Sequence, residues 1–214
     1  MLEAQSVVYL LDDEESIVVS LGRMLRASGF AIRGFTSAAE FLAAHDPGIA
    51  GCLVADVRMP GMSGLELQRS LQASGVDRSI VFITGRGDIP TTVQAMKAGA
   101  VTFLSKPVER AELVAAVREA IAKDTERRAQ HREQQEISRR LASLTPRERQ
   151  VLDLVAAGML NKQIAAQLGA AEKTIKVHRG RIMGKMQVRT ATALVGLLSR
   201  AELAAGQPRT PAGS

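Results

Sequence analysis

The sequence contains a set of acidic, hydroxyl and amino side chains that fall directly at the ends of apolar runs. These side chains are Asp12, Asp13, Asp56, Thr84 and Lys106. Three carboxylates brought to one place repel one another, and a hard divalent cation that prefers oxygen ligands, Mg²⁺ or Mn²⁺, relieves that repulsion. The three aspartates are therefore candidate metal ligands.

The same residue types can also support chemistry at phosphorus. A carboxylate can attack phosphorus as a nucleophile and form an acyl phosphate. The hydroxyl of Thr84 can donate to a phosphoryl oxygen, and the ammonium of Lys106 can neutralise charge on the side opposite the metal. A structural alternative stays open, because the acidic residues at 12–15 and Asp56 could instead stabilise the N-termini of the helices that follow them.

Five short apolar runs, rich in Val, Ile, Leu and Phe, precede or contain these residues and are predicted to be β-strands. The runs are VVYLL (7–11), FAIRGF (30–35), GCLVAD (51–56), SIVFIT (79–84) and AVTFLS (100–105). Apolar residues at helical spacing predict helices that start near Ser16, Ser37, Ser63, Asp88 and Glu109. Strict alternation of the two predicts a doubly wound α/β domain with a five-stranded parallel sheet. Functional residues gather at the carboxyl ends of the strands in such a fold.

Four motifs in this part of the chain resemble those of the receiver domains of two-component response regulators, in order and in spacing. They are DDE at 12–14, DVRMPGMSG at 56–64, ITG at 83–85 and SKP at 105–107. The resemblance implies a flavodoxin-like receiver in which Asp56 is the phosphoacceptor. It further implies that Thr84 and Lys106 contact the phosphoryl group.

Other roles follow from the same resemblance. The implied Mg²⁺ ligands are Asp12, Asp13, Asp56 and the backbone carbonyl of Arg58. The bond between Lys106 and Pro107 matches the position of a cis peptide, and X-Pro is the bond at which cis costs least. Thr84 and Phe103 match the two switch residues of the family, although Phe103 could equally be an ordinary core residue of its strand.

Charge is divided unevenly along the chain. Residues 1–120 carry 11 Lys and Arg against 14 Asp and Glu, whereas residues 121–214 carry 17 against 8. A basic second half suggests a nucleic-acid-binding module, although a solvated basic surface would give the same count. Four helical patterns follow within 141–203, and the turn LGAAE between the second and third is typical of a helix-turn-helix unit.

The stretches LTPRE, NKQIA and EKTIKVH in this half resemble the LuxR-type helix-turn-helix of NarL and FixJ regulators, most nearly the FixJ and StyR-like subfamily. The predicted DNA contacts are Lys162, Lys173, Thr174, Lys176, Val177, Arg179, Arg181 and Lys185. Capping or solvation is the alternative for Lys162 and Thr174. Gly180 stands where relatives often have a longer or basic side chain, so the preferred DNA sequence cannot be borrowed from a relative.

The predicted organisation is a receiver at 5–120, a helical linker at 121–140, the DNA-binding domain at 141–203 and a disordered tail at 204–214. The polar linker has no apolar repeat every 3.5 residues, which favours a solvated helical spacer over a coiled coil. The N-terminus lacks signal-peptide regions and no apolar run is long enough to span a membrane, so a cytoplasmic location without membrane contact is expected.

Together these features predict a DNA-binding response regulator. A sensor histidine kinase would phosphorylate it, and it would activate transcription with RNA polymerase as a phosphorylation-dependent homodimer bound to promoter DNA. The receiver would catalyse only its own phosphorylation and dephosphorylation, and the protein would not otherwise be an enzyme. One alternative is a phosphorylation-independent transcription factor whose receiver is a dimerisation module. A haloacid dehalogenase-type hydrolase is disfavoured, because that chemistry needs an acid where this chain has Arg58.

Overall fold

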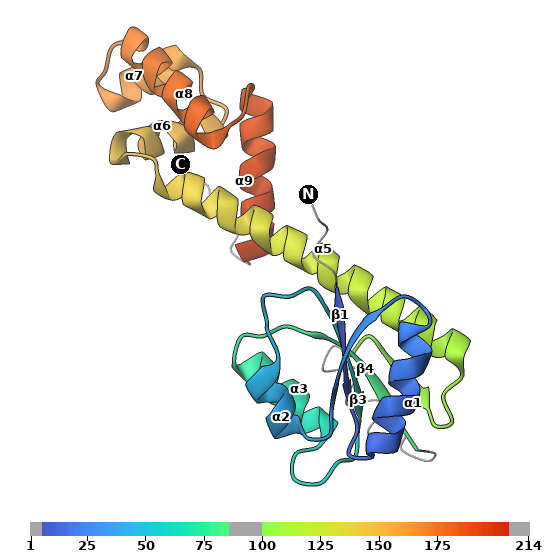
Figure 1. Cartoon of the computed structure of the whole chain (residues 1–214). Helices are drawn as coiled ribbons and strands as arrows, with labels where there is room; N and C mark the ends of the chain where they lie inside the picture. Colours follow the sequence, from blue (N-terminus) through green and yellow to red (C-terminus); the bar gives the residue numbers. More distant parts are fainter. Residues whose placement is uncertain (1–5, 86–99, 206–214) are drawn as a thin grey trace. The chain divides into compact units, whose positions relative to one another are not determined.

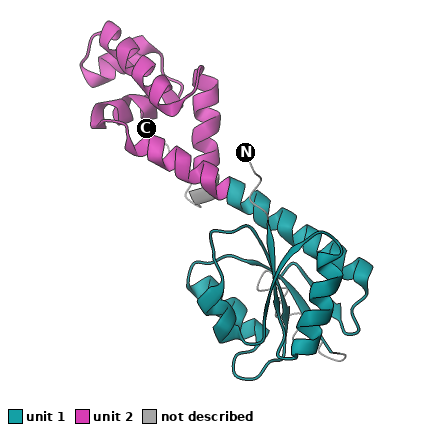
Figure 2. Ribbon diagram, viewed as in Figure 1, with its two compact units in different colours: residues 1–129 teal, residues 130–214 magenta. Residues whose placement is uncertain are grey.

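The computed structural model describes residues 6–85 and 100–205, and the chain divides into two compact units, residues 1–129 and 130–214 (Figures 1 and 2). Each unit is described by itself. The helix predicted to start at Asp88 lies outside the described residues.

Unit 1 contains a five-stranded sheet in which every neighbouring pair of strands is parallel. The strands are β1 (Val7–Leu11), β2 (Ala31–Phe35), β3 (Gly51–Asp56), β4 (Ser79–Thr84) and β5 (Thr102–Ser105), in the spatial order β2-β1-β3-β4-β5. The doubly wound α/β fold predicted from the sequence is therefore confirmed. Strands β2 and β5 begin one and two residues later than predicted, whereas the other three begin and end where the apolar runs do.

Helices cover both faces of this sheet (Figure 1). They are α1 (Glu15–Arg26), α2 (Ala38–Ala44), α3 (Gly64–Ala73) and α5 (Arg110–Ala142). Helices α2 and α3 pack on the face that carries Tyr9 and Phe82, and α1 and α5 pack on the face that carries Val8 and Val81. Successive strand side chains point to opposite faces, so strands with a core on each side are apolar throughout.

The loop after β3 depends on a glycine at its end. Gly64 begins α3, and a Cβ atom there would lie 2.4 Å from the backbone oxygen of Asp56 and 2.9 Å from the ring of Phe82. The Gly64 N–H donates to the carbonyl of Val57 at 3.0 Å. Only glycine therefore lets the chain turn this closely behind Asp56, which explains the last residue of the DVRMPGMSG motif.

Unit 2 has a core of its own, and helices are its regular secondary structure up to residue 205, where the described residues end. Besides the end of α5 it contains α6 (Pro146–Ala156), α7 (Asn161–Leu168), α8 (Glu172–Met186) and α9 (Ala191–Ala205). Thr145 and Glu148 form a capping box at the start of α6. Helix α9 continues to Ala205, into the stretch predicted as a tail, and residues 206–214 lie outside the described residues.

The stretch predicted as a linker is helical and belongs to α5, a single helix of 33 residues. Two residues of this predicted solvated spacer are buried, since Asp124 is 0% exposed and Ile137 is 3% exposed. Ile137 packs into the core of unit 2, and Asp124 is neutralised by arginines within unit 1. Polarity of the sequence could not reveal this, because a carboxylate can be buried when cations pair with it.

Candidate functional site

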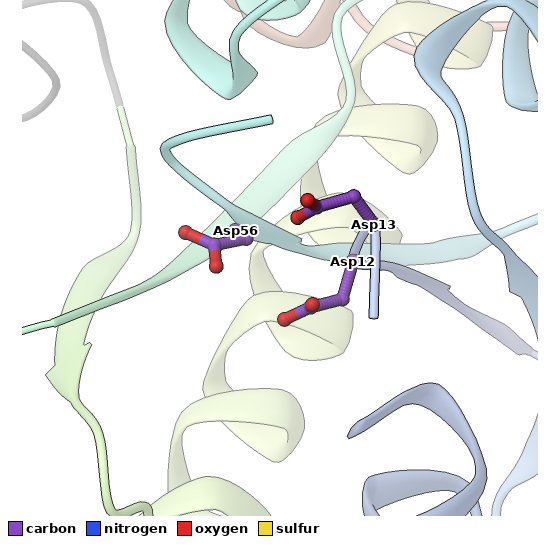
Figure 3. A group of neighbouring side chains, drawn as sticks. All are labelled: Asp12, Asp13 and Asp56. Carbon is purple, nitrogen blue, oxygen red and sulfur yellow. The ribbon is translucent and has the colours of Figure 1, made fainter. Parts of the chain in front are cut away.

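Three carboxylates meet at the carboxyl edge of the sheet. Asp12 and Asp13 follow β1 and Asp56 ends β3, and one oxygen from each lies within 4.8 Å of the others (Figure 3). Strands β1 and β3 are hydrogen-bonded neighbours, which brings the two strand ends together. Asp12 is buried, Asp56 is half-buried and Asp13 is exposed, so the group opens to solvent on one side. The structure thus brings together the three side chains predicted to hold a metal.

Lys106 joins two of these carboxylates. Its Nζ lies 2.8 Å from Oδ2 of Asp12 and 2.5 Å from Oδ2 of Asp56. Burial opposes the charge on Lys106, but the hydrogen bonds to the two aspartates outweigh burial and raise its pKa. The side chain therefore stays cationic at neutral pH, directly beside the predicted phosphoacceptor.

Backbone N–H groups donate to the Oδ1 atoms of Asp12 and Asp56, the oxygens that do not contact Lys106. The N–H of Arg58 donates to Oδ1 of Asp56 at 3.0 Å, and the N–H of Glu14 donates to Oδ1 of Asp12 at 3.0 Å. Each carboxylate thus has one oxygen on the backbone and the other on Lys106. This arrangement fixes the orientation of Asp56 before any ligand arrives.

Thr84 and Phe103 flank this edge of the sheet. Thr84 ends β4, next to β3, and its buried hydroxyl donates to the carbonyl of Gly85 at 3.3 Å. Phe103, in β5, is half-buried with its ring centroid 5.4 Å from that of Phe82. The Lys106–Pro107 peptide bond is cis.

The donor set suits a hard divalent cation. All three candidate ligands are carboxylates, and a single ammonium group pairs with two of them. Oxygen-only donors with an excess of negative charge are what Mg²⁺ and Mn²⁺ prefer. The residues present therefore fit the metal predicted from the sequence.

A second candidate site is the outer face of α8 in unit 2. Ile175, Ile182 and Met186 are buried in the core of this unit, as their spacing predicts. The other face carries exposed side chains; these are Lys173, Thr174, Lys176, Val177 and Arg181, and Arg179 is half-buried. Val177 is 47% exposed and so offers an apolar surface among the cationic side chains of this face. Lys162 is exposed at the start of α7.

Lys185 is placed differently from the prediction. Its Nζ lies 2.6 Å from Oε2 of Glu148 and donates to the carbonyl of Ser143 at 2.9 Å. The hydrogen bonds from Lys185 and from the Thr145 backbone lower the pKa of the buried Glu148 to about 2. Lys185 therefore joins α8 to the start of α6, and this pairing competes with the predicted contact to DNA. Sequence reasoning missed this pair because Glu148 lies 37 residues away along the chain.

Gly180 lies on the exposed side of α8. Among the residues that the structure describes, none would come within 4 Å of a Cβ atom added there. Packing inside the unit thus does not require this glycine, which costs the helix about 1 kcal/mol relative to alanine.

Comparison with known proteins gives a family match for each half of the chain. Residues 8–118 match the response regulator receiver domain, and residues 142–198 match the bacterial regulatory proteins of the luxR family. The transcriptional regulatory protein FixJ of Azorhizobium caulinodans is 42% identical, across 95% of this chain and 97% of that protein. The response regulator protein TodT of Pseudomonas putida is 42% identical, across 94% of this chain and 88% of its own length.

Solved structures of response regulators are also similar to this chain. The response regulator StyR is 47% identical and aligns with a TM-score of 0.86 over 92% of this chain and 100% of that chain. Full-length FixJ from B. japonicum is 40% identical, with a TM-score of 0.57 over 94% of this chain and 99% of that one. An aspartate cluster on a doubly wound sheet, followed by a helix-turn-helix unit, defines a receiver protein with a DNA-binding output. The chain belongs to the two-component response regulators of the NarL/FixJ family, with a LuxR-type DNA-binding domain.

The relatives are transcriptional regulators rather than metabolic enzymes. Within residues 6–85 and 100–205, no helix is both long and apolar enough to cross a membrane. The cytoplasmic location expected from the sequence stays a prediction.

Proposed function

We propose that this response regulator accepts a phosphoryl group on Asp56 from a sensor histidine kinase and, in that state, binds promoter DNA as a homodimer to activate transcription with RNA polymerase. The observation that carries the proposal is the position of Lys106, which lies within hydrogen-bonding distance of both Asp12 and Asp56 at the edge where three carboxylates meet.

The reaction would use Asp56 as the nucleophile. One carboxylate oxygen attacks phosphorus, the bond from phosphorus to the imidazole nitrogen of the donor breaks, and the released imidazole takes up a proton. Lys106 stabilises the added negative charge, and the hydroxyl of Thr84 becomes a donor to a phosphoryl oxygen. Asp12, Asp13, Asp56 and the carbonyl of Arg58 would hold Mg²⁺, which supplies further charge neutralisation when it is bound.

Phosphorylation adds about 1.5 to 2 negative charges beside Thr84. We propose that Thr84 and Phe103 respond to this charge and alter the face of the receiver that forms the dimer. Phe103 fits such a role because it is half-buried, so its ring has room to change exposure.

Labelling by acetyl phosphate in the presence of Mg²⁺ tests the assignment of Asp56. The Asp56→Asn variant is expected to show no phosphorylated species on phosphate-affinity electrophoresis, because an amide cannot form the acyl phosphate. The control variant Glu112→Gln, which alters an exposed carboxylate in the first turn of α5, is expected to label like the wild type. Undiminished labelling of Asp56→Asn would refute the assignment.

The DNA interface is proposed to be the outer face of α8, with Lys173, Lys176, Arg179 and Arg181 as its cationic contacts. Lys162 and Thr174 would contact the DNA backbone. Val177 is suited to an apolar contact with a base edge such as the thymine methyl group. Gly180 leaves room for the helix to approach the duplex closely.

The salt dependence of DNA binding separates a phosphate contact from a structural lysine. Lys176→Ala is expected to reduce the slope of log affinity against log salt concentration by about 1, because one cation that displaces counterions is lost. Lys185→Ala is the matched control on the same helix. It is expected to lower the thermal midpoint and leave the slope unchanged, because its ammonium pairs with Glu148. An unchanged slope for Lys176→Ala, measured by fluorescence anisotropy, would contradict the proposed interface.

A further inference from the structure

A buried ionic cluster lies at the edge of the sheet opposite Asp56. Its centre is Asp124 of α5, whose side chain is 0% exposed although the surrounding sequence is strongly polar. Oδ2 of Asp124 accepts from the N–H of Gly51 at 3.0 Å and from Nε of Arg128 at 2.6 Å. Oδ1 accepts from Arg127. The carboxylate therefore has three donors, two of them cationic.

Two arginines of this cluster hold the loop that precedes β3. Arg128 donates to the carbonyls of Pro47, Gly48 and Ile49 at 2.7, 3.1 and 3.0 Å. Arg78, which is 5% exposed, donates to the carbonyls of Ile49 and Asp46 at 2.9 and 2.8 Å. Every carbonyl from Asp46 to Ile49 thus accepts from a guanidinium group.

The third arginine connects α5 to the loop that precedes β4. Arg127 pairs with the carboxylate of Asp77 at 2.9 Å and also donates to its backbone carbonyl. Asp124 therefore sits between two loops that lead into the central strands, and its two neighbours on α5 bind one loop each. We call Asp124, Arg78, Arg127 and Arg128 the α5 latch.

The latch is separate from the phosphoacceptor site. It meets β3 at its first residue, Gly51, whereas Asp56 is the last residue of that strand. The five steps along the strand from Gly51 to Asp56 span about 16 Å. Gly51 has a φ of 148°, and a Cβ atom there would lie 1.9 Å from the carbonyl oxygen of Val7. A glycine is thus required at the position whose N–H reaches Asp124.

The latch extends the receiver beyond its apolar core. The last α5 residue in the core of unit 1 that is fully buried is Ala120, and Asp124 is the only buried residue in 121–136, all of which the structure describes. The next buried residue is Ile137, which belongs to the core of unit 2. Without Asp124, the helix after Ala120 would have no fully buried residue in the receiver, and Arg127 and Arg128 would lose their shared carboxylate.

We propose that Asp124 is a positioning residue that holds α5, from its start to Arg128, as a rigid part of the receiver. Phosphorylation alters DNA binding only while this part of the helix is rigid. A change in the receiver can bias the DNA-binding unit through α5 only while that helix is held at both ends. The coupling part of the inference rests on the proposed function, whereas the structural part does not.

The test uses three full-length proteins. They are the wild type, Asp124→Asn and Glu119→Gln. The control removes a carboxylate from the same helix, where Glu119 makes only an exposed pair with Lys123. Arg127→Gln is a milder second variant, since it removes one donor to Asp124 and leaves Gly51 and Arg128 in place.

Hydrogen exchange of peptides from residues 121–128 tests the latch itself. Asp124→Asn is expected to lower their protection at least about tenfold, because a buried charge network loses its centre, while Glu119→Gln changes it less than about twofold. The protection of these peptides in Arg127→Gln is expected to lie between the values for the other two variants. Protection equal to that of the wild type in both latch variants would overturn the latch.

DNA affinity with and without acetyl phosphate tests the coupling, with a duplex that phosphorylated wild type selects from a random pool. Asp124→Asn and Arg127→Gln are expected to label at Asp56 like the wild type and to bind the duplex equally well when unphosphorylated. The gain on phosphorylation is expected to shrink toward onefold. A full gain in both variants would overturn the coupling. If phosphorylation did not increase the DNA affinity of the wild type, the proposed function and the coupling would both be contradicted. The hydrogen-exchange result would still test the α5 latch independently.

Discussion

Lys106 and Lys185 show how the same residue type takes two roles in one chain. Lys106 pairs with two half-buried or buried aspartates at an edge that opens to solvent, so a ligand can reach its ammonium. Lys185 pairs with a glutamate that is 2% exposed and with a backbone carbonyl inside unit 2. The position of Lys106 therefore suits binding of a phosphoryl group, whereas that of Lys185 stabilises the fold of unit 2.

Glu148 should make unit 2 sensitive to acid. Its pKa is lowered from 4.5 to about 2 in the folded chain, so the pair stabilises the fold fully above the unfolded pKa and loses this effect as pH falls from about 4.5 to about 2. Glu148→Gln is expected to cost roughly 2–3 kcal/mol at pH 7 and much less near pH 2. Chemical denaturation at both pH values measures this. An equal loss at both pH values would contradict the role of the charge.

Among the helices, α7 begins at an N-cap residue whose side chain cannot accept a hydrogen bond. Its N-cap residue is Leu160, which is 68% exposed and has extended backbone angles. The side chain of Gln163 already accepts from the N–H of Leu160 at 2.8 Å. One half of a capping box is therefore present, and the hydroxyl that would complete it is missing.

Leu160→Ser is expected to stabilise unit 2 by about 1 kcal/mol, because the serine hydroxyl can accept from the N–H of Gln163. Leu160→Ala is the control, since it shortens the side chain without adding an acceptor. Thermal or urea unfolding measures both variants. If serine and alanine gave the same stability, the missing cap would not be the reason.

Local sequence patterns predicted most elements well. The bounds of three strands follow from apolar runs, which depend on neighbours a few residues apart. The contacts of Lys185 and Asp124 could not be predicted, because Lys185 meets Glu148 at a separation of 37 residues and Asp124 meets Gly51 at 73. The acidic cluster was predictable because parallel strands place their carboxyl ends at one edge.

At the scale of the whole molecule, the chain joins a chemical unit to a DNA-binding unit through one helix. Helix α5 contributes Leu113 and Val117 to the core of unit 1 and Ile137 to the core of unit 2. Both units therefore share an element of secondary structure.

Assembly is expected to depend on phosphorylation, since paired DNA half-sites require two copies of the helix-turn-helix unit. Sedimentation velocity with beryllofluoride and Mg²⁺ should show a dimer at micromolar concentration, and the Asp56→Asn variant should remain a monomer under the same conditions. A wild type that stays monomeric at every concentration would argue against this route. A dimer in both proteins would favour a receiver that dimerises without phosphorylation.

We propose that Asp56 alone carries the phosphoryl group, and chemical trapping identifies the phosphorylated residue. Borohydride reduces an aspartyl phosphate to homoserine, which peptide mass spectrometry can locate after treatment with acetyl phosphate and Mg²⁺. We expect homoserine at position 56 and unmodified aspartate at positions 12 and 13. Homoserine at position 12 or 13, or no homoserine at any of the three positions, would contradict the assignment of Asp56.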